Sequence, residues 1–131
     1  VVFQDNLSTA ACILDRYIRA ANAAAGWNFD ITFAESTQIG RYAKGGFYDW
    51  HVDEDLLSEN NEQRKLSGVL LLSDTSEFKG GEFKFKDIKD QPVMEQGSII
   101  VFPSFLKHTV TPVTSGKRIS AVSWMHGPKF K

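Results

Sequence analysis

The sequence predicts a mainly β domain of the α+β class: a jelly roll with one N-terminal helix packed against its outer sheet. Three observations support this fold class. An alanine-rich segment near the start has helical spacing, several later segments have the character of short strands, and glycine-containing turn signals separate those strands. Many short strands with regular turns are typical of antiparallel sandwiches and small barrels.

The helix is predicted over residues 10–25. Cap-forming side chains at residues 6–9 precede it, its alanine, leucine and arginine residues are good helix formers, and Gly26 follows as a stop signal. We expect the lone cysteine, Cys12, to be a small core residue on this helix. The apolar side chains that recur at helical spacing are Ile13, Tyr17, Ala20 and Ala21, with Leu14 and Ile18 beside them.

After Gly26 the apolar period changes to two. Apolar and polar residues alternate from Trp27 to Phe33, which predicts a strand over residues 27–33 with one buried face. The polar segment 54–65 is interpreted as a surface loop. Further strands are predicted over residues 38–42, 66–73, 82–86, 98–102, 109–113 and 118–125.

Length and charge indicate one globular domain over residues 1–131. The chain has 15 basic and 16 acidic residues, so its formal net charge is −1. Proteins that bind nucleic acid usually carry a basic excess, so this balance argues against nucleic acid as a partner. The apolar runs are too short to span a membrane and the first residues do not form a leader. We therefore expect a cytoplasmic protein without membrane contact, with a monomer as the default.

Three residues are candidates for a metal site. His51 and Asp53 are two positions apart, so on an extended segment their side chains point to one face. His108 follows a predicted strand, and antiparallel pairing could bring it beside the first two. Two histidines and one carboxylate on one face of a metal form the facial triad of non-haem Fe(II) oxygenases. Each residue alone also has an ordinary structural interpretation, and for His126 we expect a surface position without a ligand role.

Arg118 is the candidate anion-binding residue. It follows His108 by ten residues across a Thr-Ser-Gly turn, which predicts a hairpin with the two residues on adjacent strands. Arg118 and every second residue up to Trp124 would share one face, while Lys117 points to solvent. A buried arginine needs an anion because an unpaired guanidinium is costly to bury, and its planar fork suits a carboxylate. That carboxylate could belong to a ligand, or to an Asp or Glu of the chain in a structural ion pair.

The order His51-x-Asp53, His108 and Arg118 resembles that of the Fe(II)/2-oxoglutarate-dependent dioxygenases, and more narrowly that of the prolyl 4-hydroxylases and the PKHD-type hydroxylases. The resemblance covers residues 38–127 and implies a double-stranded β-helix. The segments that match the family are Arg41-Tyr42, Tyr48-x-x-His51-Val-Asp53, Leu66 to Asp74, Gly80-Gly81-Glu82, Gly97-Ser98, Phe102-Pro103-Ser104, His108-x-Val110-x-Pro112-Val113 and Arg118-x-Ser120-x-x-Ser123-Trp124.

The resemblance implies a reaction and its cofactors. Fe(II) would be held by His51, Asp53 and His108, and 2-oxoglutarate would bind that metal and pair its distal carboxylate with Arg118. Such an enzyme uses O₂ to hydroxylate an aliphatic carbon while 2-oxoglutarate becomes succinate and CO₂, and ascorbate can support its activity. By the same resemblance, Tyr42 would hydrogen-bond the cosubstrate.

The walls of the cosubstrate pocket are also assigned by resemblance. Leu71, Phe83 and Trp124 would line it. In prolyl hydroxylases a tyrosine often occupies the position of Leu71 and makes a second contact to the distal carboxylate, so this chain departs from the family pattern there.

The expected substrate is a prolyl residue in a peptide or protein. Tyr48 would stand near the open metal position, and Tyr48 and Trp50 could pack against a proline ring or simply form sheet surface. A free amino acid or another small molecule is an alternative, as is a non-catalytic, cupin-like module that binds a metal or ligand. Nucleic-acid demethylases of this class usually carry a second arginine six residues after the first, where this chain has Trp124.

Overall fold

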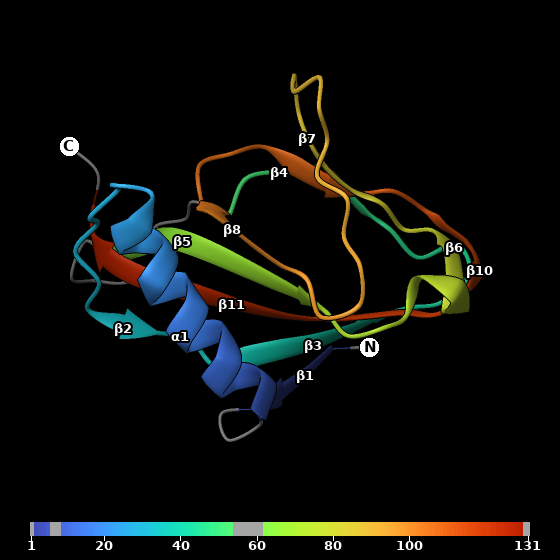
Figure 1. Cartoon of the computed structure of the whole chain (residues 1–131), viewed down its shortest axis with the longest axis horizontal. Coiled ribbons are helices and arrows are strands. Elements are labelled where there is room, and N and C mark those ends of the chain that lie inside the picture. The colour runs from blue at the N-terminus through green and yellow to red at the C-terminus, as the bar shows by residue number, and fades with distance from the viewer. Residues whose placement is uncertain (1, 6–8, 54–61, 130–131) are drawn as a thin grey trace.

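The structure is a computed structural model that describes residues 2–5, 9–53 and 62–129, with one α helix, one short 3-10 helix and eleven strands in these segments (Figure 1). The elements in chain order are β1 (Val2–Asp5), α1 (Thr9–Ala24), β2 (Phe33–Ala34), β3 (Thr37–Tyr42), β4 (Tyr48–His51), β5 (Glu62–Leu71), η1 (Thr75–Glu77), β6 (Phe78–Gly80), β7 (Phe83–Phe85), β8 (Ile99–Pro103), β9 (His108–Val110), β10 (Val113–Gly116) and β11 (Arg118–Pro128).

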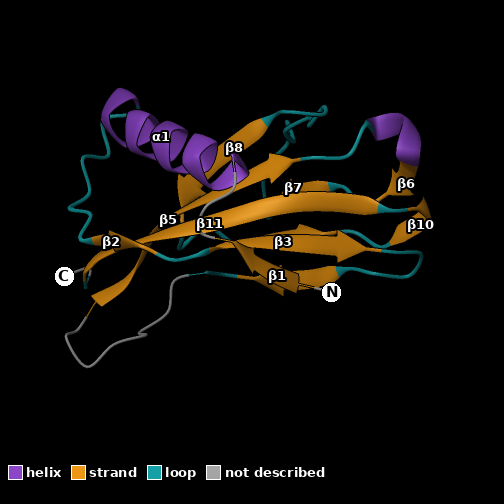
Figure 2. Ribbon diagram, turned by 90° about the horizontal axis from the view of Figure 1, so that it is seen from below, coloured by secondary structure: helices purple, strands orange, loops and turns teal. Residues whose placement is uncertain are grey.

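The strands form two facing antiparallel sheets and a short ribbon. The larger sheet has the order β1-β3-β11-β5-β8, and β2 also pairs with β11. The smaller sheet has the order β4-β9-β7, and β10 pairs with β6 at one end of the molecule (Figure 1). Helix α1 packs on β5, β11 and β8 of the larger sheet (Figure 2). The predicted jelly roll with a helix on its outer sheet is therefore confirmed.

Strand β5 of the larger sheet is buried on both faces, between the helix and the smaller sheet. Leu66 and Leu70 pack with the helix, whereas Val69 packs with Phe83 of the smaller sheet. Successive side chains of a strand point to opposite faces, so a continuous apolar run is what a strand between two layers requires. The predicted strand over 66–73 reflects this run.

Helix α1 is confirmed, but its buried stripe is centred on Leu14 and Ile18, which are fully buried. Ile13 and Tyr17 lie at the edge of the stripe and are exposed. Cys12 is also exposed, so the expectation of a core cysteine was wrong. Cys12 precedes Leu14 by two residues, about 200° around a helix of 3.6 residues per turn, and therefore points away from the sheet.

The predicted strand over residues 27–33 is largely wrong, because only Phe33 and Ala34 pair with β11. The side chain of Asn22 explains the difference: its amide donates to the carbonyl of Phe29 and accepts from the Phe29 N–H, both at 2.9 Å. The N–H and the carbonyl of Phe29 are therefore not available to pair with a neighbouring strand. The alternating residues Trp27, Phe29 and Ile31 instead pack partly buried against the helix-side core.

The polar segment predicted as a loop over 54–65 divides in two. Residues 54–61 lie outside the described part of the chain. Residues 62–65 belong to β5, where Gln63 and Lys65 are buried, so the loop prediction was wrong there. Strand β5 begins at Glu62, before the predicted start at residue 66, because β11 continues to Pro128 and pairs with Glu62.

The strands predicted over 38–42, 82–86 and 98–102 agree with β3, β7 and β8 within one residue at each end, and the strand predicted over 118–125 extends three residues further, to Pro128. One prediction fails. The predicted strand over 109–113 divides into β9 and β10, which belong to different sheets. Pro112, which has no N–H to donate to a ladder, lies between them.

Helix α1 has 16 residues, and no helix in the described segments has the length and apolar character to cross a membrane.

Candidate metal centre

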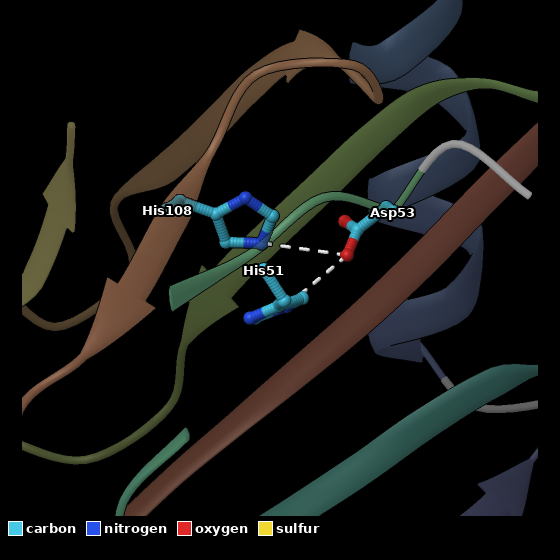
Figure 3. Close-up of side chains that lie close together, drawn as sticks. All are labelled: His51, Asp53 and His108. Atoms are coloured by element: carbon cyan, nitrogen blue, oxygen red, sulfur yellow. Dashed lines mark ion pairs between the residues drawn. The ribbon is translucent and has the colours of Figure 1, made fainter. Parts of the chain in front are cut away.

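His51, Asp53 and His108 converge on one point between the two sheets (Figure 3). His51 and His108 are directly opposite each other in the antiparallel pair β4–β9, and Asp53 follows two residues after β4 ends. Asp53 Oδ1 lies 3.2 Å from His51 Nε2 and 3.4 Å from His108 Nε2. The candidate ligand atoms of all three residues lie within 4.8 Å of one another. Antiparallel pairing thus brings His108 beside the other two, as predicted.

The orientation of both imidazole rings is fixed by backbone carbonyls. His51 Nδ1 lies 2.7 Å from the carbonyl oxygen of Asp49, and His108 Nδ1 lies 2.9 Å from that of Leu106. A carbonyl oxygen only accepts, so each Nδ1 carries the proton and each Nε2 faces the shared point. This is the arrangement in which metal-binding histidines are usually held.

Asp53 is buried and its two carboxylate oxygens have different partners. Oδ1 faces the histidines, while Oδ2 accepts hydrogen bonds from Ser67 Oγ at 2.7 Å and from Trp124 Nε1 at 3.1 Å. Burial alone would raise the pKa of Asp53, but the adjacent imidazoles of His108 and His51, together with the Ser67 hydroxyl, hold that pKa far below its usual value. Asp53 is therefore an ionised carboxylate with one oxygen directed at the site.

Arg118 is 2% exposed and has no acidic partner among the described residues. Its Nη1 donates to Ser120 Oγ at 3.2 Å, and its Cζ lies 5.7 Å from the centre of the Tyr42 ring. Burial lowers the pKa of the Arg118 guanidinium, although the nearby Tyr42 opposes that change. Within the described segments, the alternative of a structural ion pair finds no Asp or Glu to supply it.

The predicted hairpin between His108 and Arg118 was wrong. His108 lies on β9 of the smaller sheet and Arg118 on β11 of the larger sheet. The chain does not turn back directly between them, because β10 pairs with β6 in the separate ribbon. Arg118 therefore faces the histidines from the opposite wall. Its predicted face is correct, since Trp124 and the alternate residues between them line the same cavity.

The two sheets enclose a cavity of about 100 Å³ that contains both the triad and Arg118. Of the residues expected around a cosubstrate, Tyr42, Phe83 and Trp124 line this cavity. Leu71 instead lines an adjoining cavity of about 490 Å³, to which Phe83 and Arg118 also contribute. Arg118 and Phe83 thus border both cavities, whereas Leu71 borders only the adjoining one.

Tyr48 and Trp50 differ in their relation to this cavity. Tyr48 lines it and stacks on His51, with ring centroids 3.7 Å apart. A register shift between Tyr48 and His51 interrupts the strand alternation, so both residues reach the cavity. Trp50 is exposed and does not line the cavity.

His126, Glu35 and Arg64 form a partly buried cluster that was not predicted from the sequence. His126 was expected at the surface, but it is 1% exposed and its Nε2 lies 2.5 Å from Glu35 Oε2. Phe33 stacks on it, which explains its burial. Glu35 also accepts two hydrogen bonds from Arg64. Glu35 is separated from Arg64 by 29 positions and from His126 by 91 positions, so a local sequence pattern does not predict these contacts.

Comparison with known proteins assigns the chain to a family. The family profile of the 2OG-Fe(II) oxygenase superfamily matches residues 37–126. The chain belongs to this superfamily. This 2OG-Fe(II) oxygenase is 36% identical over 89 residues to a PKHD-type hydroxylase of Idiomarina loihiensis, and 39% identical over 89 residues to one of Prochlorococcus marinus. Each match covers 66% of the chain but only 40% and 39% of the relative, so the chain spans about two fifths of their length.

Solved structures show the same fold at lower sequence identity. The viral collagen prolyl hydroxylase of Paramecium bursaria Chlorella virus 1, in its 2OG complex, is 23% identical, with a TM-score of 0.77 over 98% of this chain and 79% of that one. A prolyl-4-hydroxylase of Pseudomonas putida is 21% identical, with a TM-score of 0.67 over 95% and 70% of the two chains. The predicted double-stranded β-helix is thereby confirmed for this oxygenase.

The residues present fit the cofactors of the superfamily, which are Fe(II), 2-oxoglutarate and O₂. Two imidazole nitrogens and one carboxylate oxygen on one side of a point form a suitable donor set for Fe(II) and leave the opposite side open. A buried guanidinium without an acidic partner supplies the counterion that a dicarboxylate needs.

Proposed function

We propose that this chain is the catalytic core of a 2-oxoglutarate-dependent hydroxylase that oxidises an aliphatic carbon, with a prolyl residue in a peptide or protein as its substrate. One observation carries the proposal: a His-Asp-His cluster and a buried arginine without an acidic partner face the same cavity from opposite sheets. A site that only binds a metal has no need for that arginine.

In this proposal, His51, Asp53 and His108 hold Fe(II). Their backbone and side-chain partners fix the two Nε2 atoms and Asp53 Oδ1 in advance, so little reorganisation is needed when the metal binds. Three ligands on one side leave positions for the cosubstrate and for O₂ on the other.

Arg118 pairs with the distal carboxylate of 2-oxoglutarate. A guanidinium offers two parallel N–H donors that match a carboxylate, and the buried position of Arg118 strengthens that pairing. Tyr42, which is register partner to Arg118 in β3, places its hydroxyl-bearing ring beside the same group. Phe83 and Trp124 form walls of the triad cavity, and Leu71 lines the adjoining cavity that Arg118 also borders.

When bound, Fe(II) and 2-oxoglutarate supply the activation of O₂ that is coupled to decarboxylation of the cosubstrate. The chain itself supplies geometry and a dry surrounding. Phe83 and Phe102 pack against the ring of His108 and exclude water from that side. Tyr48 covers His51 on the solvent side, so the substrate carbon would approach beside this exposed tyrosine, with Trp50 further out.

The names of the relatives and of the structural neighbours support a prolyl substrate. The relatives it matches are named PKHD-type hydroxylases, and structural neighbours are named prolyl hydroxylases, one of them in complex with a peptide fragment. The exposed aromatic rings of Tyr48 and Trp50 beside the triad offer surfaces on which a proline ring can pack.

The test measures succinate formation from 2-oxoglutarate with Fe(II) and ascorbate, in the presence of proline-containing peptides. Matched peptides with alanine in place of proline, and free proline, serve as controls. We expect succinate formation coupled to a mass gain of one oxygen atom on the prolyl peptide alone. Failure of the protein to bind 2-oxoglutarate by calorimetry with Mn(II), together with no succinate formation, would refute the reaction. Turnover with free proline alone would refute the peptide substrate.

A further inference from the structure

We propose that Arg64 is a positioning residue for the metal centre, which acts by holding the Trp124 indole against the carboxylate of Asp53. This inference rests on the proposed function, because it assigns Asp53 to the metal. Neither Arg64 nor its partner Glu35 lines the triad cavity. Their influence would pass through Trp124, which contacts both Arg64 and Asp53.

The first step is the hydrogen bond between Trp124 and Asp53. Trp124 Nε1 donates to Asp53 Oδ2 at 3.1 Å, and Ser67 Oγ donates to the same oxygen at 2.7 Å. With Oδ2 engaged on the protein side, Oδ1 is left to face His51 and His108. The direction of the indole N–H therefore sets the rotation of the carboxylate and the position of its free oxygen.

The second step is the contact between Arg64 and Trp124. The guanidinium carbon of Arg64 lies 3.9 Å from the centre of the Trp124 ring. Arg64 on β5 is register partner to His126 on β11, two residues beyond Trp124, so the guanidinium lies over the indole face from the neighbouring strand. A planar cation on an indole face is attracted by the ring electrons and restricts ring rotation.

The third step is the clamp on Arg64 itself. Its Nε and Nη2 donate to the two carboxylate oxygens of Glu35 at 2.7 and 3.0 Å, which is a bidentate pair. The backbone N–H of Glu35 donates to the carbonyl oxygen of Trp124 at 2.9 Å. Glu35, Arg64 and Trp124 therefore form a closed ring of contacts, and His126 Nε2 contacts the same Glu35 carboxylate.

This ring differs from an ordinary surface ion pair. Arg19 and Asp15 on α1 form a pair with 3.2 Å separation, in which both side chains are about half exposed at 49% and 47%. Arg64 and Glu35 are exposed by only 19% and 23%, and their fork is fixed by a third group. Exposed pairs contribute little, whereas an enclosed bidentate pair can hold a neighbouring ring in one orientation.

The experiment measures Mn(II) affinity by calorimetry on the whole chain, with far-UV circular dichroism to verify folding. Arg64→Met removes the fork and charge, and Trp124→Phe removes the indole N–H but keeps a ring. Arg19→Met is the matched control for losing an arginine from an ion pair. We expect Arg64→Met and Trp124→Phe each to weaken Mn(II) binding by about 10- to 100-fold, as loss of a partner to a metal ligand typically does. Arg19→Met should bind as the parent chain does.

The double variant Arg64→Met/Trp124→Phe separates positioning from general destabilisation. If Arg64 acts through Trp124, the double variant binds Mn(II) no more weakly than Trp124→Phe alone. Arg64→Lys, which keeps the charge over the ring, should recover part of the loss. If Arg64→Met is poorly folded, Glu35→Gln loosens the clamp with a smaller change and should weaken Mn(II) binding in the same direction.

Independent, additive effects of the two substitutions would overturn the inference, as would parent-like affinity in a folded Arg64→Met or Glu35→Gln chain. Absence of Mn(II) binding by the parent chain would instead refute the proposed function, so the two failures are distinguishable.

Discussion

Arg118 is buried without an acidic partner among the described residues, and this indicates a site for an anionic ligand. A guanidinium has five N–H donors, and only one hydrogen bond, to Ser120, occupies them among the described residues. Burial without a counterion is costly, so the cavity beside Arg118 is suited to an anion rather than to water alone.

Replacing this cation tests the anion site directly. We expect Arg118→Ala to weaken 2-oxoglutarate binding by about 2–5 kcal/mol, the usual loss when one partner of a buried charge pair is removed, and to leave Mn(II) binding nearly unchanged. Calorimetry with Mn(II) present measures both affinities. Arg41→Ala, an exposed arginine adjacent to Tyr42, is the control and should have no effect. Unchanged 2-oxoglutarate affinity in Arg118→Ala would show that the carboxylate binds elsewhere.

Asp53 supports a second prediction at the residue scale. Asp53→Ala removes the only carboxylate of the triad and leaves two imidazoles, so Mn(II) binding and succinate formation should both fall below detection. Titration of Mn(II) into the folded variant tests this expectation. Binding that survives with the parent affinity would place the metal outside the triad.

Part of the site could be predicted from residues alone. The spacing His51-x-Asp53 and the inward face of Arg118 follow from strand periodicity, which is local. The partners of Asp53 could not be predicted, because Ser67 and Trp124 lie 14 and 71 positions away and reach it only after the sheets have paired. His126 was misplaced for the same reason: its burial depends on Glu35 and Phe33, which come from another part of the chain.

At the scale of elements, α1 packs closely on β5 at Gly68. A Cβ placed on Gly68 would lie 2.5 Å from Ile18 Cδ1 and 2.6 Å from its Cγ1. Gly68 is therefore required by packing rather than by backbone conformation, since it gives the helix room to lie directly on the strand.

This contact predicts a pair of coupled substitutions. Gly68→Ala should destabilise the fold by about 1–3 kcal/mol, because the added methyl group overpacks the layer under α1. Ile18→Val alone should cost about 0.5–1.5 kcal/mol, since it deletes the methyl group that Gly68 faces. The double variant should be more stable than the sum of the two losses predicts, and urea unfolding measures all three. Simple additivity would indicate that the helix is not seated on Gly68.

The elements themselves differed in how far sequence could predict them. Strands β3, β5, β7, β8 and β11 followed from apolar runs and turn signals, since each is buried on at least one side. The segment after α1 misled the prediction, because its alternation arises from packing under the helix while Asn22 takes the backbone groups of Phe29. The sheet to which β9 and β10 belong depends on pairing between distant strands, which local pattern does not contain.

At the scale of the whole molecule, the metal site links the two sheets and should stabilise the fold when filled. His51 and His108 come from the smaller sheet, while Asp53 is tied to β5 and β11 of the larger sheet through Ser67 and Trp124. A metal bound only to the folded chain at about 100 times its dissociation constant adds about 2.7 kcal/mol to the free energy of unfolding. Thermal unfolding with and without Mn(II) should show this gain in the parent chain, and Asp53→Ala should not show it.

Acid should weaken the fold through Glu35. Burial would raise the pKa of Glu35, but hydrogen bonds from Arg64 and His126 outweigh burial and lower it below the usual value of 4.5. The stabilisation from ionised Glu35 is therefore fully present above pH 4.5 and is lost as the pH falls through the lower, folded-state pKa. Urea unfolding across this acid range should show a shallower loss of stability for Glu35→Gln than for the parent chain. Parallel curves would contradict the assignment.

Strand β11 holds Arg118 and Trp124 in one register, because it pairs with β3 from Arg118 to Val122 and with β5 from Ser120 to Met125, before the register shift at His126. Because side chains alternate along a strand, inserting or deleting one residue between Arg118 and Trp124 would turn one of the two out of the cavity. Homologous chains that keep this site should therefore have no insertion or deletion between Arg118 and Trp124. A change in length before Arg118, by contrast, leaves the six-residue separation from Arg118 to Trp124 intact.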